Sequence, residues 1–325
     1  MSSAPAARRL LLPLVPLYRL GLTVREWRLS SGRERVQRLK WPVIGIGNLS
    51  TGGAGKTPLT IALARTLTAR GLHVDVLSRG YGRRSAVPLV VDPGGTAEEF
   101  GDEPLVIARE AGVPVYVAAE RYEAGLLAET VLDDGLHLLD DGFQHRQLHR
   151  DVNLLLLNRQ DWHDSLLPAG NLREPHSAIR RADVLVIPAE EPELEPLLRA
   201  RGFSQPVWPV RRRMEPPAVQ GPVVAFCGIA RPEQFFAGLE AAGMQVASRV
   251  AFRDHHRYVP HDMDLLRDAV RSVNATAIVT TGKDSARLGA MAARLDEAAP
   301  LRTAGLHAEL QDEAAAVDWI LARLG

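Results

Sequence analysis

The stretch Asn48-Leu-Ser-Thr-Gly-Gly-Ala-Gly-Lys-Thr-Pro58 decides the fold class of this 325-residue chain. It ends like the phosphate-binding loop G-x-x-x-x-G-K-[ST], but Ser50 stands where that pattern has its first glycine. Residues 41–47 before it are apolar and predict a buried strand, and residues 58–67 after it carry apolar side chains at helical spacing. A strand, a glycine-rich loop and a helix in this order are the context that a nucleotide site requires. The alternative is a glycine-rich turn with a chance Gly-Lys-Thr.

The residue types in this loop suit the chemistry of a bound phosphate. Glycines let backbone N–H groups converge on phosphate oxygens, and the N-terminus of the following helix adds its positive end. Lys56 would reach the β- and γ-phosphates, and the hydroxyl of Thr57 would bind Mg²⁺. The predicted nucleotide-binding residues are Ser50, Thr51, Gly52, Gly53, Ala54, Gly55, Lys56 and Thr57.

Apolar strands alternate with helical segments through the first two thirds of the chain. The expected strands are 73–77, 87–91, 114–117, 136–139, 152–157 and 184–187, with helices such as 122–131 between them. This alternation predicts an α/β fold of the P-loop NTPase type, in which helices cover a largely parallel sheet on both faces. Ligands of such sheets bind at the carboxyl ends of the strands, so polar residues there are candidates for the site.

Two acidic pairs lie where such a site would form. Asp140 and Asp141 directly follow an apolar strand, a Walker-B pattern that places a carboxylate near Mg²⁺. Adjacent aspartates point to different sides, so one can serve the metal and the other the substrate or a proton, whereas a solvated turn is the alternative. Asp102 and Glu103 belong to Gly-Asp-Glu-Pro, which by itself is an ordinary helix N-terminus with Asp102 as the cap.

The last third of the chain predicts a second, smaller α/β domain with its own polar cluster. Phe252-Arg-Asp-His-His-Arg-Tyr258 holds two adjacent histidines, and no zinc-site spacing accompanies them. A histidine paired with a carboxylate as proton acceptor is the favoured function, and the sequence leaves open whether His255 or His256 forms this pair. The predicted division is an N-terminal region 1–40, a P-loop domain 41–205, a linker 206–220 and the smaller domain 221–325.

Charge and cysteine content narrow the class of protein. The net charge is zero, but residues 1–40 carry nine basic and two acidic side chains, a local charge of +7. A single cysteine, Cys227, excludes an internal disulfide framework and a cysteine-based zinc site.

The basic N-terminal region also carries a leucine-rich segment. Leu17, Leu20, Val24 and Trp27 recur at helical spacing, but the apolar run is shorter than the roughly 20 residues of a membrane span. No small-residue cleavage site follows, which disfavours a signal peptide. Two interpretations remain: a basic amphipathic helix on an anionic membrane surface, or a helix packed on its own domain.

The motifs in their order resemble one family. They are "GNLSTGGAGKTP", "LSRGYGR", "GDEP", "LLDDGFQH", "PAGNLREP", "FRDHHRY" and "TTGKD", and the resemblance runs from about Leu10 to Leu288. Together they closely resemble tetraacyldisaccharide 4'-kinases, also called lipid A 4'-kinases, which likewise carry a hydroxyl residue at the position of Ser50. Asn171 and Gly282 are less typical of the family, and neither is a functional group on which the interpretation depends.

The resemblance implies a transferase of the lipid A branch of lipopolysaccharide biosynthesis. Such an enzyme transfers the γ-phosphate of ATP, with Mg²⁺, to the 4'-hydroxyl of an acylated glucosamine disaccharide 1-phosphate and yields lipid IVA. It implies a peripheral protein on the cytoplasmic face of the bacterial inner membrane, which strengthens the membrane interpretation of the N-terminal helix. We expect a monomer whose partners are the lipid substrate and an anionic membrane surface, with no nucleic acid.

The resemblance also implies roles for individual residues. Asp102 is the expected base and His255 its partner, and Lys56 and Asp141 complete the expected catalytic set. Thr57, Glu103 and Asp140 are expected at the metal ion. The expected substrate-binding residues are Asn48, Arg79, Tyr81, Gln144 and Arg173.

Two other classes of protein share part of this pattern. A membrane-associated P-loop switch would need no base for a substrate hydroxyl, and the [NT]-K-x-D signature of guanine readers is not evident. A soluble small-molecule kinase or ligase would leave the basic, leucine-rich N-terminus unexplained.

Overall fold

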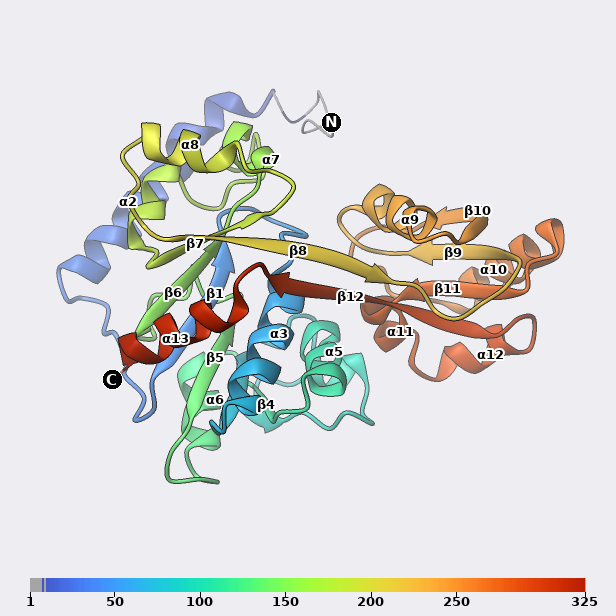
Figure 1. Ribbon diagram of the computed structural model, residues 1–325, viewed down its shortest axis with the longest axis horizontal. Helices are drawn as coiled ribbons and strands as arrows, with labels where there is room; N and C mark the ends of the chain where they lie inside the picture. The colour runs from blue at the N-terminus through green and yellow to red at the C-terminus, as the bar shows by residue number, and fades with distance from the viewer. Residues whose placement is uncertain (1–7, 9, 325) are drawn as a thin grey trace. The chain divides into compact units, whose positions relative to one another are not determined.

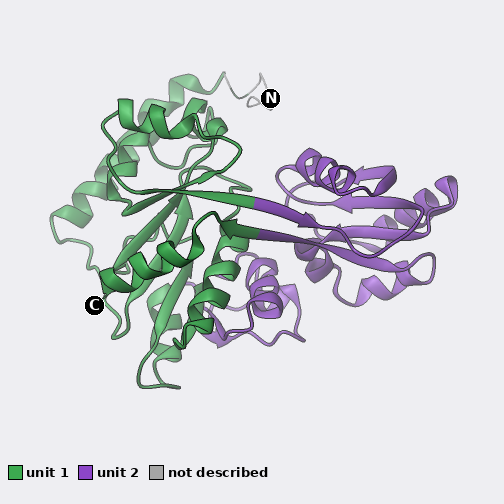
Figure 2. Ribbon diagram, viewed as in Figure 1, with its two compact units in different colours: residues 1–78, 120–211, 308–325 green, residues 79–119, 212–307 purple. Residues whose placement is uncertain are grey.

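The computed structural model describes residue 8 and residues 10–324, so residues 1–7 and 9 of the predicted N-terminal region lie outside the described residues. The chain divides into two compact units (Figure 2). Unit 1 comprises residues 1–78, 120–211 and 308–325, and unit 2 comprises residues 79–119 and 212–307.

Unit 1 is built on a parallel sheet whose strands are buried on both faces. Its strand order is β8-β7-β6-β1-β5-β2, and each neighbouring pair runs parallel. The near-continuous apolar runs of the sequence fit such strands, because helices cover both faces of a parallel sheet. The strands are β1 (Val43–Asn48), β2 (Val74–Ser78), β5 (Leu136–Asp140), β6 (Val152–Leu156), β7 (Val184–Pro188) and β8 (Val207–Glu215), the last of which continues into unit 2.

The helices of unit 1 lie on both sides of this sheet (Figure 1). α3 (Lys56–Ala69) packs on β1, β2 and β5. On the core that includes Leu155 and Leu185, the apolar side chains of α8 (Leu194–Ala200) and α2 (Val15–Ser30) pack together. The other helical elements are η1 (Leu12–Leu14), α6 (Arg121–Ala128), α7 (Arg159–His163), η2 (His176–Arg181) and α13 (Glu313–Leu324).

Unit 2 contains a smaller parallel sheet with the strand order β10-β9-β11-β12. Helices cover both of its faces, because alternate side chains of β9 belong to two different apolar clusters, Phe226 to one and Ala225 to the other. The elements are β9 (Pro222–Cys227), α9 (Pro232–Ala241), β10 (Gln245–Ala251), α10 (Pro260–Val273), β11 (Ala277–Thr281), α11 (Gly282–Leu288), η3 (Gly289–Met291), α12 (Ala292–Asp296) and β12 (Leu301–Leu310).

A second segment, residues 79–119, also belongs to unit 2. The predicted strand 87–91 is reduced here to two residues, which pair antiparallel with the next strand. Its elements are β3 (Leu89–Val90), α4 (Ala97–Phe100), α5 (Asp102–Ala111) and β4 (Val115–Val117). The α/β fold class with a largely parallel sheet, predicted from the sequence, is confirmed.

The compact units cut the chain differently from the predicted domains. Residues 79–119 group with 212–307, and the C-terminal residues group with the P-loop. The segment 206–220, expected as a linker, contains strand β8. Such groupings join segments far apart in the chain, which local sequence patterns do not encode.

The N-terminal helix α2 has two apolar stripes on opposite faces. Val15, Tyr18 and Leu22 pack against the core of unit 1, as expected for a helix packed on its own domain. The predicted membrane-facing stripe remains exposed, with side chains between 47% and 67% accessible: Leu17, Leu20, Val24 and Trp27. Across the part of the chain that the structure describes, no helix is both long and apolar enough to cross a membrane.

Candidate active site

The phosphate-binding loop lies between the end of β1 and the start of α3. Gly52 and Gly55 adopt positive φ values of 96° and 89°, which side chains with a Cβ rarely reach. Helix α3 begins at Lys56. The ammonium group of Lys56 donates to Asn48 Oδ1 at 2.8 Å. Asn48 in turn donates to Ser50 Oγ at 3.0 Å, so the hydroxyl in place of the first glycine has a structural partner.

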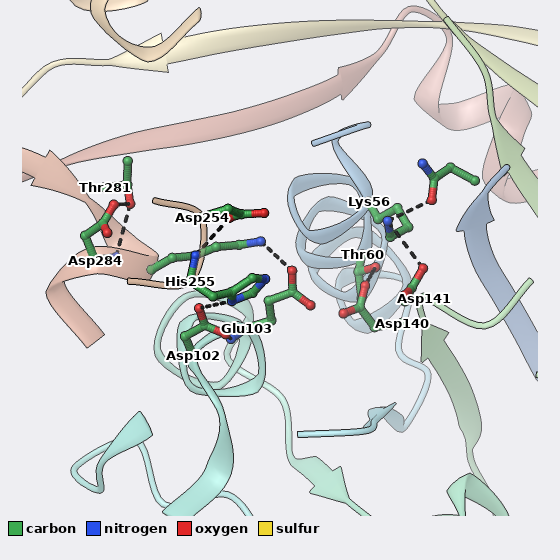
Figure 3. A network of polar contacts seen from close by, with 12 residues as sticks. Lys56, Thr60, Asp102, Glu103, Asp140, Asp141, Asp254, His255, Thr281 and Asp284 are labelled. Atoms are coloured by element: carbon green, nitrogen blue, oxygen red, sulfur yellow. Dashed lines mark hydrogen bonds and ion pairs between the residues drawn. The ribbon is translucent and has the colours of Figure 1, made fainter. Parts of the chain in front are cut away.

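The two predicted aspartates follow β5, which lies beside β1 in the sheet. Asp140 is buried and accepts a hydrogen bond from the hydroxyl of Thr60 at 3.1 Å. Thr60 was not among the predicted residues, although its position one turn after Thr57 on the same helix was a usable signal. Asp141 has a φ of 49°, and its side chain makes a different set of contacts (Figure 3). The two carboxylates therefore have separate environments, as their adjacency predicts.

Asp141 lies between two cations. Its carboxylate is 3.3 Å from Lys56 Nζ and 2.9 Å from Arg173 Nη1. Burial opposes ionisation, but the two positive charges outweigh it and hold the pKa of Asp141 well below the usual range of a carboxyl. The group is therefore an anion at neutral pH and can orient Lys56.

Three of the predicted substrate-binding residues join this network in unit 1. Gln144 donates to the Asn48 carbonyl at 2.8 Å and accepts from Arg173 Nη1 at 3.3 Å. The backbone N–H of Arg173 donates to the Leu49 carbonyl at 2.7 Å, so the loop that carries Arg173 is tied to the end of β1. The structure thus brings Asn48, Gln144 and Arg173 together with Lys56 and Asp141.

The predicted proton-transfer pair lies within unit 2. His255 Nδ1 is 3.2 Å from Asp102 Oδ2, although the two residues are 153 positions apart (Figure 3). Asp102 is the first residue of α5, and Gly101, not Asp102, occupies the N-cap position. The Asp102 side chain nevertheless accepts the backbone N–H of Glu103 in the first turn at 2.9 Å. The carboxylate is 5% accessible and the histidine side chain is 40% accessible.

The contact changes the ionisation of both groups. The hydrogen bond to Asp102 raises the pKa of His255 above its ordinary value. Burial opposes ionisation of Asp102, but His255, Lys283 and Arg287 outweigh it and lower the pKa of this carboxyl. Asp102 is therefore ionised at neutral pH and poised to share a proton with the imidazole ring.

The neighbouring histidine has a structural role. His256 Nε2 lies 2.9 Å from Asp262 Oδ2, and Asp262 also accepts the backbone N–H of Val259 at the start of α10. The ring of His256 stacks on Phe252 with 4.7 Å between centroids. The sequence left open which of the two histidines pairs with Asp102. In the structure His255 contacts Asp102, whereas His256 contacts Asp262.

Two further predicted residues of unit 2, Glu103 and Tyr81, lie beside this pair. Glu103, expected at the metal ion, accepts from Lys283 Nζ at 2.5 Å. The ring of Tyr81 is 5.2 Å from that of His255, and Arg79 is an exposed residue at the start of the same segment. The other two residues expected at the metal ion, Thr57 and Asp140, belong to unit 1.

These features define the class of the protein. A glycine-rich loop opening a helix with Lys-Thr, an aspartate at the end of the adjacent strand and a carboxylate–histidine pair are the parts of a P-loop kinase. The sequence profile of LpxK, described as tetraacyldisaccharide-1-P 4'-kinase, matches residues 7–325, and the chain belongs to this family.

Individual relatives are similar over nearly the whole chain. Tetraacyldisaccharide 4'-kinase from Koribacter versatilis is 41% identical over 324 residues, which cover 95% of this chain and 97% of the relative. The enzyme of the same name from Geobacter metallireducens is 40% identical, over 86% of this chain and 88% of the relative. A crystal structure of LpxK from Aquifex aeolicus in complex with ATP is 33% identical, with a TM-score of 0.76, and covers 98% of this chain and 100% of that one.

The family establishes the activity in outline. The protein is a kinase that phosphorylates a precursor of lipid A at the 4' position, and its substrate is a lipid. The family resemblance and the enzyme class predicted from the motifs are confirmed.

Proposed function

We propose that Asp102 and His255 together accept the proton of the substrate's 4'-hydroxyl while that oxygen receives the γ-phosphate of ATP. The observation that carries this assignment is the 3.2 Å contact between Asp102 Oδ2 and His255 Nδ1 within one compact unit. A sugar hydroxyl is a poor nucleophile, and its proton must leave as the phosphoryl group arrives. The acceptor is an acylated glucosamine disaccharide 1-phosphate, and the product is lipid IVA.

Each member of the pair contributes differently. Asp102 supplies the negative charge, and the hydrogen bond at Nδ1 sets the tautomer of the His255 ring. Nε2 of His255 is the ring nitrogen on the side away from Asp102, on the more exposed of the two side chains. A proton can therefore pass between the substrate oxygen and the buried carboxylate through the pair.

ATP occupies the P-loop in this proposal. The backbone N–H groups of the loop and Lys56 bind the phosphates, and Asp141 keeps Lys56 in place. The oxygens of Thr57 and Asp140 fit Mg²⁺, a hard cation that protein sites bind through one or two carboxylates together with substrate phosphates. When bound, the ion would neutralise charge on the β- and γ-phosphates. Glu103 remains a proposed third group near the metal and phosphates.

The lipid head group has its own proposed contacts. Asn48, Gln144 and Arg173 form a hydrogen-bonded set at the end of β1, and Arg173 offers a planar guanidinium suited to phosphate and sugar oxygens. Arg79 and Tyr81 are the proposed contacts from unit 2. Tyr81 is 62% accessible and close to the ring of His255, so it can pack on a sugar ring.

The exposed stripe of α2 supports attachment to a membrane. The leucines, valine and tryptophan of this stripe lie on a helix within a region of +7 charge, the combination that binds anionic lipid surfaces. We propose that the protein lies peripherally on the cytoplasmic face of the bacterial inner membrane, where its substrate is anchored by acyl chains. A P-loop switch that modifies no substrate would not need the proton acceptor formed by Asp102 and His255. A soluble small-molecule kinase would not need the exposed apolar stripe of α2.

The test is transfer of labelled γ-phosphate from ATP to the acylated disaccharide 1-phosphate by the purified protein. Asp102→Asn and His255→Gln should each lower turnover by about 10²–10⁴-fold, because the proton loses its acceptor. Asp264→Asn is the matched control, since Asp264 is an exposed carboxylate of the same unit. The double variant should lose less than the product of the two single losses, because the two residues act as a unit. Normal turnover in Asp102→Asn, or fully multiplicative losses, would overturn the proposal.

A further inference from the structure

Arg287 of helix α11 is a buried cation beside the proposed catalytic pair. Its side chain is 9% accessible, and its Nε lies 3.1 Å from Asp102 Oδ2, the same oxygen that contacts His255. Arginine is rarely buried without an anionic partner, because removing a guanidinium from water is costly. The family motifs in the sequence do not include this residue, which follows "TTGKD" by three positions.

A second buried carboxylate lies beside the same guanidinium. Arg287 Nη2 is 3.2 Å from Asp284 Oδ1, and Asp284 is fully buried. Asp284 accepts from the Tyr258 hydroxyl at 2.7 Å and from the Gly228 backbone N–H at 2.9 Å. The Thr281 hydroxyl, 2.6 Å from Oδ2, completes this set (Figure 3). Asp284 is therefore held from several elements and gives Arg287 a rigid anchor.

A third contact joins Arg287 to the loop that carries His255. Arg287 Nη1 donates to the backbone carbonyl of His256 at 3.4 Å. One guanidinium thus touches the helix that bears Asp102, the loop that bears His255 and the anchor at the start of α11. We propose that Arg287, fixed by Asp284, is a positioning residue that holds Asp102 and His255 in the geometry of the catalytic pair.

Only arginine has the shape for this task. Its planar guanidinium spreads one charge over three nitrogens, whereas lysine carries one compact charge on a flexible stem. Nε and Nη2 form the ion pairs with Asp102 and Asp284. The hydrogen bonds of the group go to backbone carbonyls, from Nε to Lys283 at 3.3 Å and from Nη1 to His256. A lysine at this position could neutralise Asp102 or Asp284 but could not contact both carboxylates and the His256 carbonyl together. The positive charge of Arg287 also contributes to lowering the pKa of Asp102.

This inference rests on the proposed role of the pair, so its test needs one measurement that is independent of transfer. That measurement is the tautomer of the neutral His255 ring, read from the two nitrogen shifts in protein labelled with ¹⁵N-histidine. The hydrogen bond to Asp102 places the proton on Nδ1 in the wild-type protein, because the partner of one ring nitrogen decides the tautomer. His255→Gln identifies the signals.

The variants are Arg287→Gln, Arg287→Lys and the control Arg294→Gln, whose side chain is exposed on the nearby helix α12. Arg287→Gln should shift the His255 tautomer away from Nδ1–H and lower kcat by about 10²-fold, as misplacement of a reacting group by about 1 Å typically does. KM for ATP should change little, because the contacts of Arg287 described above are all with residues of its own unit. Arg287→Lys should restore part of kcat, and the control should match the wild type.

The outcomes separate the two proposals. A wild-type tautomer with unchanged kcat in Arg287→Gln overturns the positioning role, whatever Asp102→Asn does. A shifted tautomer with unchanged kcat shows that Arg287 positions the pair but that the pair is not needed for transfer, which overturns the proposed function instead. If Arg287→Gln does not fold, Arg287→Lys decides, since wild-type kcat and tautomer in that variant would show that the guanidinium is not required.

Discussion

At the scale of single residues, the ammonium of Lys56 is oriented by two oxygens. It lies 2.8 Å from Asn48 Oδ1 and 3.3 Å from Asp141 Oδ1, and both residues stand at the carboxyl ends of adjacent strands. Such prior orientation reduces the reorganisation that the transition state requires. The orientation of the Lys56 side chain therefore depends on Asn48 and Asp141 as well as on the P-loop backbone.

We expect Lys56→Ala to abolish phosphate transfer. Loss of one preorganised charge contact typically lowers the rate by about 10²–10³-fold, and Lys56 is the basic side chain of the P-loop. The measurement is transfer of labelled γ-phosphate at saturating ATP, with Lys40→Ala as control because Lys40 is exposed and precedes β1. A Lys56→Ala protein within a few-fold of wild-type turnover would end the P-loop assignment.

At the scale of elements, α2 has one apolar face that packs on its unit and one that is exposed. Residues 15, 18 and 22 follow a helical stripe that packs on unit 1, and the Tyr18 hydroxyl donates to the Arg173 carbonyl at 2.8 Å. Residues 17, 20, 24 and 27 form the opposite, exposed stripe. Deleting the helix would uncover the core as well as remove the stripe, so substitutions on the outer face are the cleaner test.

We expect the double variant Leu17→Glu/Leu20→Glu to bind anionic vesicles at least about tenfold more weakly, because it loses apolar contact and gains negative charge. Its melting temperature should stay near that of the wild type, since exposed substitutions usually change stability by about 0.5 kcal/mol or less. Vesicle co-sedimentation at several salt concentrations is the measurement, and binding should weaken as salt screens the attraction.

The matched control for the stripe is Ser30→Glu/Ser31→Glu, which adds the same charge at the exposed end of the helix. This control should bind anionic vesicles more strongly than the stripe variant does. Its KM for the lipid substrate should also be lower than that of the stripe variant. Equal vesicle binding by the wild type and the stripe variant would show that α2 is only a packed helix.

At the scale of the whole molecule, the C-terminal helix returns to the unit that contains the P-loop. α13 contacts α3 through the hydrogen bond from the Thr66 hydroxyl to Glu313 at 2.6 Å and through the ion pair of Arg70 with Asp318 at 2.9 Å. Trp319 meets the edge of Trp208 with 5.5 Å between ring centroids. The last residues of the chain therefore help to hold the helix that follows the nucleotide loop.

Truncation of a buried side chain of α13 should destabilise unit 1. Ile320 is fully buried, and Ile→Ala at such a site typically costs about 2–5 kcal/mol. Equilibrium denaturation should show this loss for Ile320→Ala, whereas Leu197→Ala, at a position 39% accessible in the same unit, should change stability little. Saturating ATP with Mg²⁺ should recover part of the loss by mass action. If the two variants melt alike, α13 does not contribute to the stability of the unit.

Residue type and local spacing are enough to predict the features of this protein that depend on neighbours in the chain. The P-loop between a strand and a helix, the aspartates at the end of β5 and the exposed stripe of α2 follow from residue type and spacing over about ten positions, which is the range of helix and strand periodicity. The order of the motifs along the chain predicted the family, and the family profile that matches residues 7–325 confirms it.

Contacts between residues far apart in the chain follow from the packing of the elements. This packing selects His255 over His256 as the partner of Asp102, across 153 positions, and it places Arg287 beside Asp102 and Asp284. Packing also groups α13 with the unit that contains the P-loop, and it buries part of one face of α2 against the core of that unit. The physical reason is that these contacts form where several elements pack together, so that burial, charge and direction are set by segments that no local pattern links.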